Sequence, residues 1–145
     1  MFESSLLSLL NTDYGITSRL STFNGVPSVF SDYAPEEVQF PYIVFDIEEN
    51  ESDSLIVDAF FIEIDIYGLR TSSKTIREIV ERVQFVCDRT IITDDERFST
   101  IRLYRDNNEL VYDNLGSRDS KMTHYIVRLQ ARGTRKKWAD NITRS

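Results

Sequence analysis

The stretch that decides the fold is YIVFDIEENESDSLIVDAFFIEIDIYG, residues 42–68. Both of its ends alternate apolar and polar side chains with a period of two, which is typical of a strand with one buried face. The residues expected on the buried face are Ile43, Phe45, Ile47, Ile56, Phe60, Ile62, Ile64 and Ile66. The acidic and small polar segment EENESDS separates the two runs. We therefore predict a long hairpin with a charged tip, which begins after Pro41 because proline cannot donate to a sheet ladder.

Two amphipathic helices are expected beside this hairpin. The stretch TSSKTIREIVERVQFVCD, residues 71–88, begins with serine and threonine residues that can serve as N-caps. It continues with one apolar stripe at helical spacing, made of Ile76, Ile79, Val80, Val83, Val86 and Cys87. A shorter helix is predicted over FESSLLSLLN, residues 2–11, whose apolar residues follow the same spacing.

Four further segments have strand patterns. A short strand is predicted within SVFSDY (28–33), and a long one over MTHYIVRLQAR (122–132). STIRLYR (99–105) and ELVYD (109–113) are expected to pair across a short turn at DNN, residues 106–108. The order of segments predicts an α+β fold, with a mostly antiparallel sheet, about two helices packed on one face and a long hairpin extension.

The length and charge of the chain indicate its class. Its 145 residues suggest a single domain, which we place at residues 1–133, followed by a basic C-terminal tail at 134–145. Residues 1–117 carry a net charge of −13 and residues 118–145 carry +6. No segment approaches the roughly 20 apolar residues that span a bilayer. The single cysteine cannot form an intramolecular disulfide, so we expect a soluble, unexported protein of a reducing compartment.

The sequence offers little material for catalysis, and we expect no catalytic, cofactor-binding or metal-binding residues. The only histidine, His124, lies in a strand pattern that places no acid to orient it, so we interpret it as structural. Cys87 lies on an apolar stripe, where a thiol behaves as a small hydrophobe. Glu63 and Asp65 bring a small metal-dependent nuclease into consideration, but Tyr67 stands where such sites place a lysine. The nuclease remains the less favoured alternative.

The order of segments resembles the tail-completion, or tail-terminator, proteins of tailed bacteriophages. The resemblance covers about residues 2–133, and its most distinctive part is the run from Ala34-Pro35 to Phe40-Pro41-Tyr42, which opens a strand. Tyr67-Gly68 before a serine- and threonine-rich helix start also matches the family pattern. The final strand, residues 125–131, has the family's alternation of aliphatic and arginine residues.

This resemblance implies a structural function. Members of the family form a ring, usually a hexamer, that caps the head-proximal end of the tail tube, ends its polymerisation and joins the tail to the neck. The implied partners are other copies of the chain, the tail tube protein and a neck or head-completion protein, while DNA passes through the lumen without specific binding. The implied location is the tail–neck junction of a virion assembled in the host cytoplasm. A neck or head-completion connector remains an alternative, as does a monomeric host-interaction module.

An acidic group at the hairpin tip is one candidate contact surface in such a ring. Its members are Glu48, Glu49, Glu51 and Asp53. Gathering four acids at one tip is mildly unfavourable in a monomer, because their repulsion is only partly screened by salt. We expect them either to line the lumen, where negative charge lets DNA slide, or to meet a basic partner.

The basic tail is the other candidate contact surface. Its basic and aromatic residues are Arg135, Lys136, Lys137 and Trp138. Such a cluster can bind nucleic-acid phosphate and stack an aromatic ring on a base. The acidic remainder of the chain repels a polyanion, so we expect the tail to dock on an acidic neighbouring subunit instead.

Overall fold

The computed structural model describes residues 2–49, 56–93, 95–106, 111–113 and 122–136. The helices are α1 (Phe2–Thr12), α2 (Tyr14–Thr17) and α3 (Ser73–Cys87), with a 3₁₀ turn, η1 (Arg70–Ser72), before α3. The longer strands are β4 (Tyr42–Glu49), β5 (Val57–Leu69), β7 (Phe98–Arg105) and β9 (Met122–Arg135). The shorter strands are β1 (Thr22–Phe23), β2 (Val26–Pro27), β3 (Val29–Ser31), β6 (Ile91–Ile92) and β8 (Val111–Asp113).

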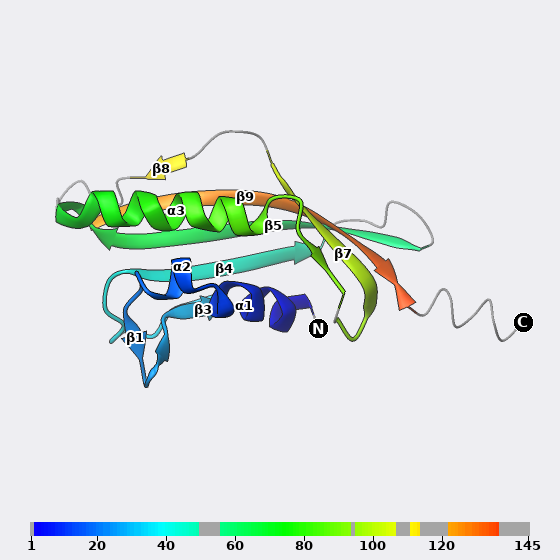
Figure 1. Cartoon of the computed structure of the whole chain (residues 1–145), viewed down its shortest axis with the longest axis horizontal. Coiled ribbons are helices and arrows are strands. Elements are labelled where there is room, and N and C mark those ends of the chain that lie inside the picture. The colour runs from blue at the N-terminus through cyan, green and yellow to red at the C-terminus, as the bar shows by residue number, and fades with distance from the viewer. Residues whose placement is uncertain (1, 50–55, 94, 107–110, 114–121, 137–145) are drawn as a thin grey trace, which may run out of the picture.

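The long strands and three of the short ones form one sheet in the order β3-β4-β5-β9-β7-β6, and β8 also pairs with β9. All of its pairs are antiparallel except β3 with β4. The centre of the sheet is the β5–β9 ladder, which runs from Val57 opposite Thr134 to Leu69 opposite Met122. Figure 1 shows the sheet curling at the end where β7 lies. The predicted α+β class with a mostly antiparallel sheet is confirmed.

The predicted hairpin of residues 42–68 is confirmed as β4 and β5. The two strands pair in register from Tyr42 opposite Tyr67 to Glu49 opposite Phe60. One face of each strand is buried, as the alternation indicated. Residues 57–59 extend β5 past the end of β4 and pair only with β9 among the described strands.

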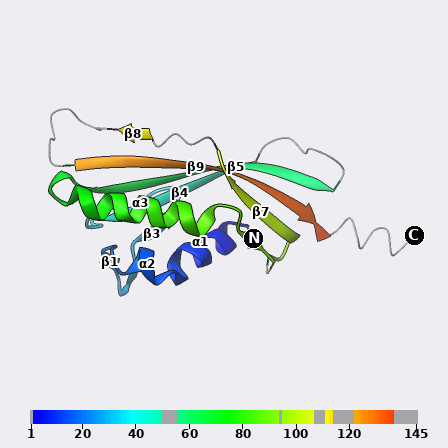
Figure 2. The ribbon, with the colours of Figure 1, turned by 45° about the horizontal axis from the view of Figure 1, so that its top comes forward.

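The two longer helices lie on the same side of the long strands, as Figure 2 shows. The stripe residues of α3 and three residues of α1 share one core with the inward-facing residues of β4, β5, β7 and β9. The strand passes very close to α3 at Gly68, where an added Cβ would lie 2.0 Å from Cδ1 of Ile76. Glycine there lets the helix approach the sheet. None of the described helices packs on the opposite side, which we call the outer face.

Strand β8 corrects one sequence-based prediction. The short turn at residues 106–108 was expected to fold ELVYD back against β7, but β8 pairs with β9 instead. The backbone N–H of Asp106 donates to the carbonyl oxygen of Arg128, so the chain continues along β9 beyond β7. Strand β9 is much longer than β7 and has a further stretch of edge to pair, which β8 occupies from Ile126 to His124. A short polar segment alone does not determine whether the chain reverses.

Smaller differences concern the ends of elements. Ser72 is the N-cap residue of α3, a position that the sequence pattern indicated, but its side chain makes no capping hydrogen bond. Val86 is only partly buried at the margin of the core. The turn at Asn24-Gly25 joins β1 and β2, and both residues have positive φ, which is typical of a tight hairpin turn. Strand β9 extends to Arg135, so the expected domain boundary after residue 133 falls inside a strand.

A search for spanning helices gives a negative result. Within the described ranges, no helix has the length and apolar character needed to cross a membrane.

Candidate functional site

The acidic end of the hairpin is described as far as Glu49. Because side chains alternate along a strand, Glu48 points to the outer face and Glu49 to the opposite one. Glu49 accepts a hydrogen bond of 3.1 Å from Nη2 of Arg97, and both side chains are about half exposed. Glu51 and Asp53 lie outside the described residues. The common role expected for the four acids therefore stays a prediction.

The end of β5 carries a buried carboxylate, Asp58, whose side chain is only 4% exposed. Oδ1 of Asp58 accepts hydrogen bonds from Nε and Nη2 of Arg135, at 3.0 and 2.5 Å. Nη2 of Arg97 lies 3.5 Å from the other carboxylate oxygen. This pairing compensates the burial of the charge and ties β5, β9 and the segment before β7 together.

The basic tail begins inside this network. Arg135, expected to dock on a neighbouring subunit, is engaged by Asp58 of its own chain. The backbone N–H of Lys136 donates to the carbonyl oxygen of Arg97 at 3.1 Å, and the Lys136 side chain is exposed. Lys137 and Trp138 lie outside the described residues. Docking of the tail on another subunit thus stays a prediction. The contact would be made by Lys136 and the residues after it, since Arg135 is already bound to Asp58.

An acidic patch occupies the outer face over β4 and β5. It consists of Asp46, Glu48, Phe61 and Glu63, which surround a hollow of about 290 Å³. Asp46 lies directly opposite Glu63 in the ladder, and such a like-charged pair costs up to about 1 kcal/mol. Arg128 partly offsets this repulsion, since its Nε lies 3.8 Å from Oε1 of Glu63.

The pKa values of two carboxyl groups in the acidic patch are raised, as expected where acids lie close together. Partial desolvation, followed by a hydrogen bond with Asp32 and the charges of Asp32 and Glu48, raises the pKa of Asp46. Desolvation and the neighbouring Asp65 raise the pKa of Glu63, against the opposing effect of Arg128. In both cases the surroundings disfavour the negative charge, so a cation brought to this surface would be favourable.

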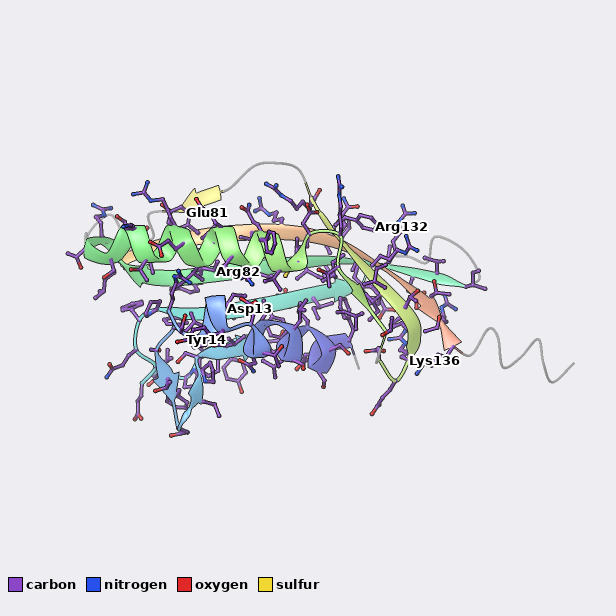
Figure 3. All side chains as sticks on the ribbon, viewed as in Figure 1. Asp13, Tyr14, Glu81, Arg82, Arg132 and Lys136 are labelled. Carbon is purple, nitrogen blue, oxygen red and sulfur yellow. The ribbon has the colours of Figure 1, made fainter. Side chains whose placement is uncertain are left out.

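A basic patch occupies the outer face over β6, β7 and the end of β9. It consists of Ile91, Arg102, Tyr104 and Arg132, and Arg102 lies directly opposite Arg132. Ile91 is 49% exposed and Tyr104 is 39% exposed, beside a hollow of about 240 Å³ that Arg102 also lines. Figure 3 shows Arg132 near β7, with Lys136 just past the end of β9. The alternation in STIRLYR indicated that Arg102 and Tyr104 point outward, but only the strand register reveals the pairing with Arg132.

His124 has a partner that the sequence pattern did not reveal. Its Nε2 lies 2.7 Å from Oδ1 of Asp65, and both residues are buried. The imidazole also stacks on Tyr67, with ring centroids 4.3 Å apart, and Tyr67 in turn stacks on Tyr42. The expectation that no acid orients this histidine is wrong. The interpretation as a structural histidine agrees with these contacts.

A clamp between α2 and α3 fixes the first part of the chain. Arg82 donates to both carboxylate oxygens of Asp13, at 2.8 and 2.9 Å, and Figure 3 shows the two residues between the helices. Asp13 also caps α2 by accepting from the backbone N–H of Ile16. The Arg82 guanidinium lies 5.0 Å from the ring of Phe85, which is 73% exposed. The clamp is structural, because these contacts satisfy the charges of both residues.

The described residues offer few reactive groups. Among them, no three or more His, Cys, Asp or Glu side chains gather in a way that could hold a metal ion. Cys87 is buried, and desolvation, with a smaller effect of the Asp13 charge, raises the pKa of its thiol to about 12. A thiol with that pKa is a poor nucleophile at neutral pH, in agreement with its interpretation as a core residue.

Comparisons with known proteins supply a likeness of fold. No family model matches the sequence, and no curated protein matches it either. The fold is similar to that of a solved protein chain from the virion of a native gene transfer agent (GTA) particle, with a TM-score of 0.70. The similarity covers 91% of this chain and 93% of that chain, at 12% sequence identity. The two chains therefore share a fold over nearly their whole lengths.

Proposed function

We propose that this protein is a structural component of a phage-like virion that forms a ring at the tail–neck junction. The ring, a hexamer by the family resemblance, caps the head-proximal end of the tail tube, ends its polymerisation and joins it to the neck. The observation that carries the proposal is the nearly complete structural likeness to a chain of a GTA virion. The order of sequence segments, which resembles tail-terminator proteins, supports the same role.

The surface of the chain is suited to assembly. The outer face of the sheet is free of the described helices and carries two patches of opposite charge. A ring requires two different, complementary surfaces on each copy, since a heterologous contact can close on itself. The virion is the location that follows, and assembly takes place in the host cytoplasm.

The charge of the chain fits a channel for DNA. The protein carries a net charge of −7, which opposes nonspecific binding of a polyanion. DNA can then move through the lumen without adhering to it. The remaining proposed partners are the tail tube protein and a neck or head-completion protein. No cofactor and no enzymatic activity are part of this function.

Deletion of the gene in a particle-producing strain tests the proposal. Without a terminator, tubes continue to grow, so electron microscopy should show tails of irregular length that are not joined to heads. Expression of the wild-type chain from a plasmid should restore uniform, joined tails. A neck or head-completion connector gives another result, namely tails of normal length beside unjoined heads. Normal particles in the deletion strain would contradict any essential virion role.

A further inference from the structure

The β1–β2 hairpin and the segment after β3 lie together beside the beginning of β4. Ser21 fixes this arrangement, because its backbone N–H donates to the carbonyl oxygen of Pro41 at 2.9 Å and its Oγ donates to that of Gln39 at 2.6 Å. The rings of Phe23 in β1 and Phe30 in β3 meet edge to face, with centroids 5.9 Å apart. The hairpin therefore contacts both ends of the segment that runs from Phe30 to Pro41.

This part of the chain exposes both acidic and apolar side chains, which we call the hairpin surface: Val26, Asp32, Tyr33, Glu36 and Glu37. Val26 is 57% exposed and Tyr33 is 78% exposed. The sequence has no lysine or arginine between Arg19 and Arg70. Within the described ranges, none of the three carboxylates of the hairpin surface forms an ion pair with a base. The surface is therefore suited to a partner that brings both an apolar group and positive charge.

The basic tail has the complementary composition and begins at the other end of the molecule. Figure 1 shows β1 at one end and the end of β9 at the other. The side chain of Lys136 is exposed, and its backbone N–H is held by the carbonyl oxygen of Arg97. Lys137 and Trp138 follow, and Trp138 is the only tryptophan in the sequence. Tryptophan is one of the residues that contribute most binding energy at protein interfaces.

We propose that Lys136, Lys137 and Trp138 of one copy dock on the hairpin surface of the next copy. Trp138 packs on Val26 and Tyr33, and the two lysines face the carboxylates. The two surfaces differ and lie at opposite ends of the chain, so each copy uses one of them toward each neighbour. Such a heterologous contact can close into a ring. This inference rests on the proposed ring function, for which it names one contact between subunits.

The register of the sheet excludes this contact within a single copy. Tyr42, at the beginning of β4, lies opposite Tyr67, and Tyr67 lies opposite His124. His124 and Lys136 are 12 positions apart, or about 40 Å at roughly 3.3 Å per residue. The Cα atom of Trp138 lies at most about 7 Å from that of Lys136. The tail residues therefore cannot reach the hairpin surface of their own copy, and a contact between them must join two copies.

Photocrosslinking from position 138 tests the contact directly. A benzophenone-bearing phenylalanine replaces Trp138 in the particle-forming strain, so an aromatic group remains at this position. Purified particles are irradiated, separated on a denaturing gel and mapped by mass spectrometry. We expect a ladder of linked copies, with attachment within residues 22–38 of the accepting copy. The same amino acid in place of Tyr14, which is 81% exposed outside the hairpin surface, is the matched control and should not attach to those residues.

The outcomes separate this contact from its alternatives. Attachment to another part of this chain, or to another protein of the particle, would overturn the contact and leave the ring function standing. Particles that contain the chain but give no linked product would do the same. A product that nuclease treatment removes would overturn the contact in favour of a nucleic-acid partner. Absence of the wild-type chain from the particles would overturn both the contact and the ring function.

Charge reversal supplies an independent measurement. Lys136→Glu/Lys137→Glu should reduce incorporation of the chain into particles by about tenfold or more, since like charges then face each other across the contact. Glu36→Lys/Glu37→Lys should do the same, because both acids are exposed members of the hairpin surface. The four changes combined should restore incorporation, since opposite charges face each other again. Circular dichroism confirms that each variant folds.

A matched control keeps the charge-reversal series specific to the contact. Lys74→Glu/Arg77→Glu makes the same charge change as the tail variant at two exposed bases of α3, outside both surfaces, and should leave incorporation unchanged. Equal incorporation of the tail variant and this control would overturn the contact. Failure of the combined variant, although folded, to regain incorporation would overturn it as well.

Discussion

Replacing Arg135 by glutamine tests whether the end of β9 is part of the folded domain. Asp58 is 4% exposed, and Arg135 makes two hydrogen bonds to it. Removing one partner of a buried ion pair costs about 3–5 kcal/mol. Arg97 remains 3.5 Å from the carboxylate and Arg135 is 32% exposed, so solvent and Arg97 offset roughly half of that cost. We expect a loss of about 2 kcal/mol, which lowers the Tm by about 4–8 °C.

Urea unfolding followed by far-UV circular dichroism, at one protein concentration, measures this loss. Lys136→Gln is the matched control, because it removes the same charge at the next position, whose side chain is exposed. Its effect should stay within about 0.5 kcal/mol. The double variant Asp58→Asn/Arg135→Gln should recover part of the loss, since no buried charge is left without its partner. Coincident transitions for wild type and Arg135→Gln would refute the reasoning.

Three further predictions concern the core, acid stability and chemistry. Val83→Ala should lower the free energy of unfolding by about 1–3 kcal/mol, because it removes fully buried methyl groups, and unchanged urea melts would contradict this core position. Hydrogen bonding from Arg82 lowers the pKa of Asp13 from its ordinary value of 3.8. Wild type should therefore lose stability as the pH falls from that ordinary value through the lowered pKa of the folded protein. Asp13→Asn should be less stable at neutral pH and lose less on acidification, and parallel stability–pH curves would contradict this. DNA and RNA incubated with magnesium or manganese should remain intact, whereas cleavage abolished by Asp65→Ala would indicate a nuclease.

The hairpin and α3 could be predicted because local pattern and final burial agree in them. The alternation of residues 42–68 and the stripe around Val83 each identify a buried face without knowledge of any distant contact. The pairing of β8 could not be predicted in the same way. It depends on the length of β9, whose open edge is a template for pairing that the turn residues do not specify.

The candidate site depended on strand register more than on local pattern. The sequence indicates that Asp65 and His124 each lie in a strand, but their contact joins positions 59 residues apart and requires the β5–β9 register. The same is true of Arg102 and Arg132, whose juxtaposition follows from the β7–β9 register. The acids at the hairpin tip were predicted to form a contact surface only because they cluster in the sequence. Arg135 was assigned to the tail because its buried partner, Asp58, lies 77 positions away in the sequence. The residues around Arg135 do not indicate that contact.

Localisation of the chain in purified particles tests the central claim most directly. A cryo-electron microscopy reconstruction of intact particles resolves the tail–neck junction, where the fold described above can be fitted to the density. We predict a closed ring of copies of this chain on the last layer of the tail tube, with the neck on its other side. Density for this fold at another position, or a junction built entirely of other proteins, would contradict the account.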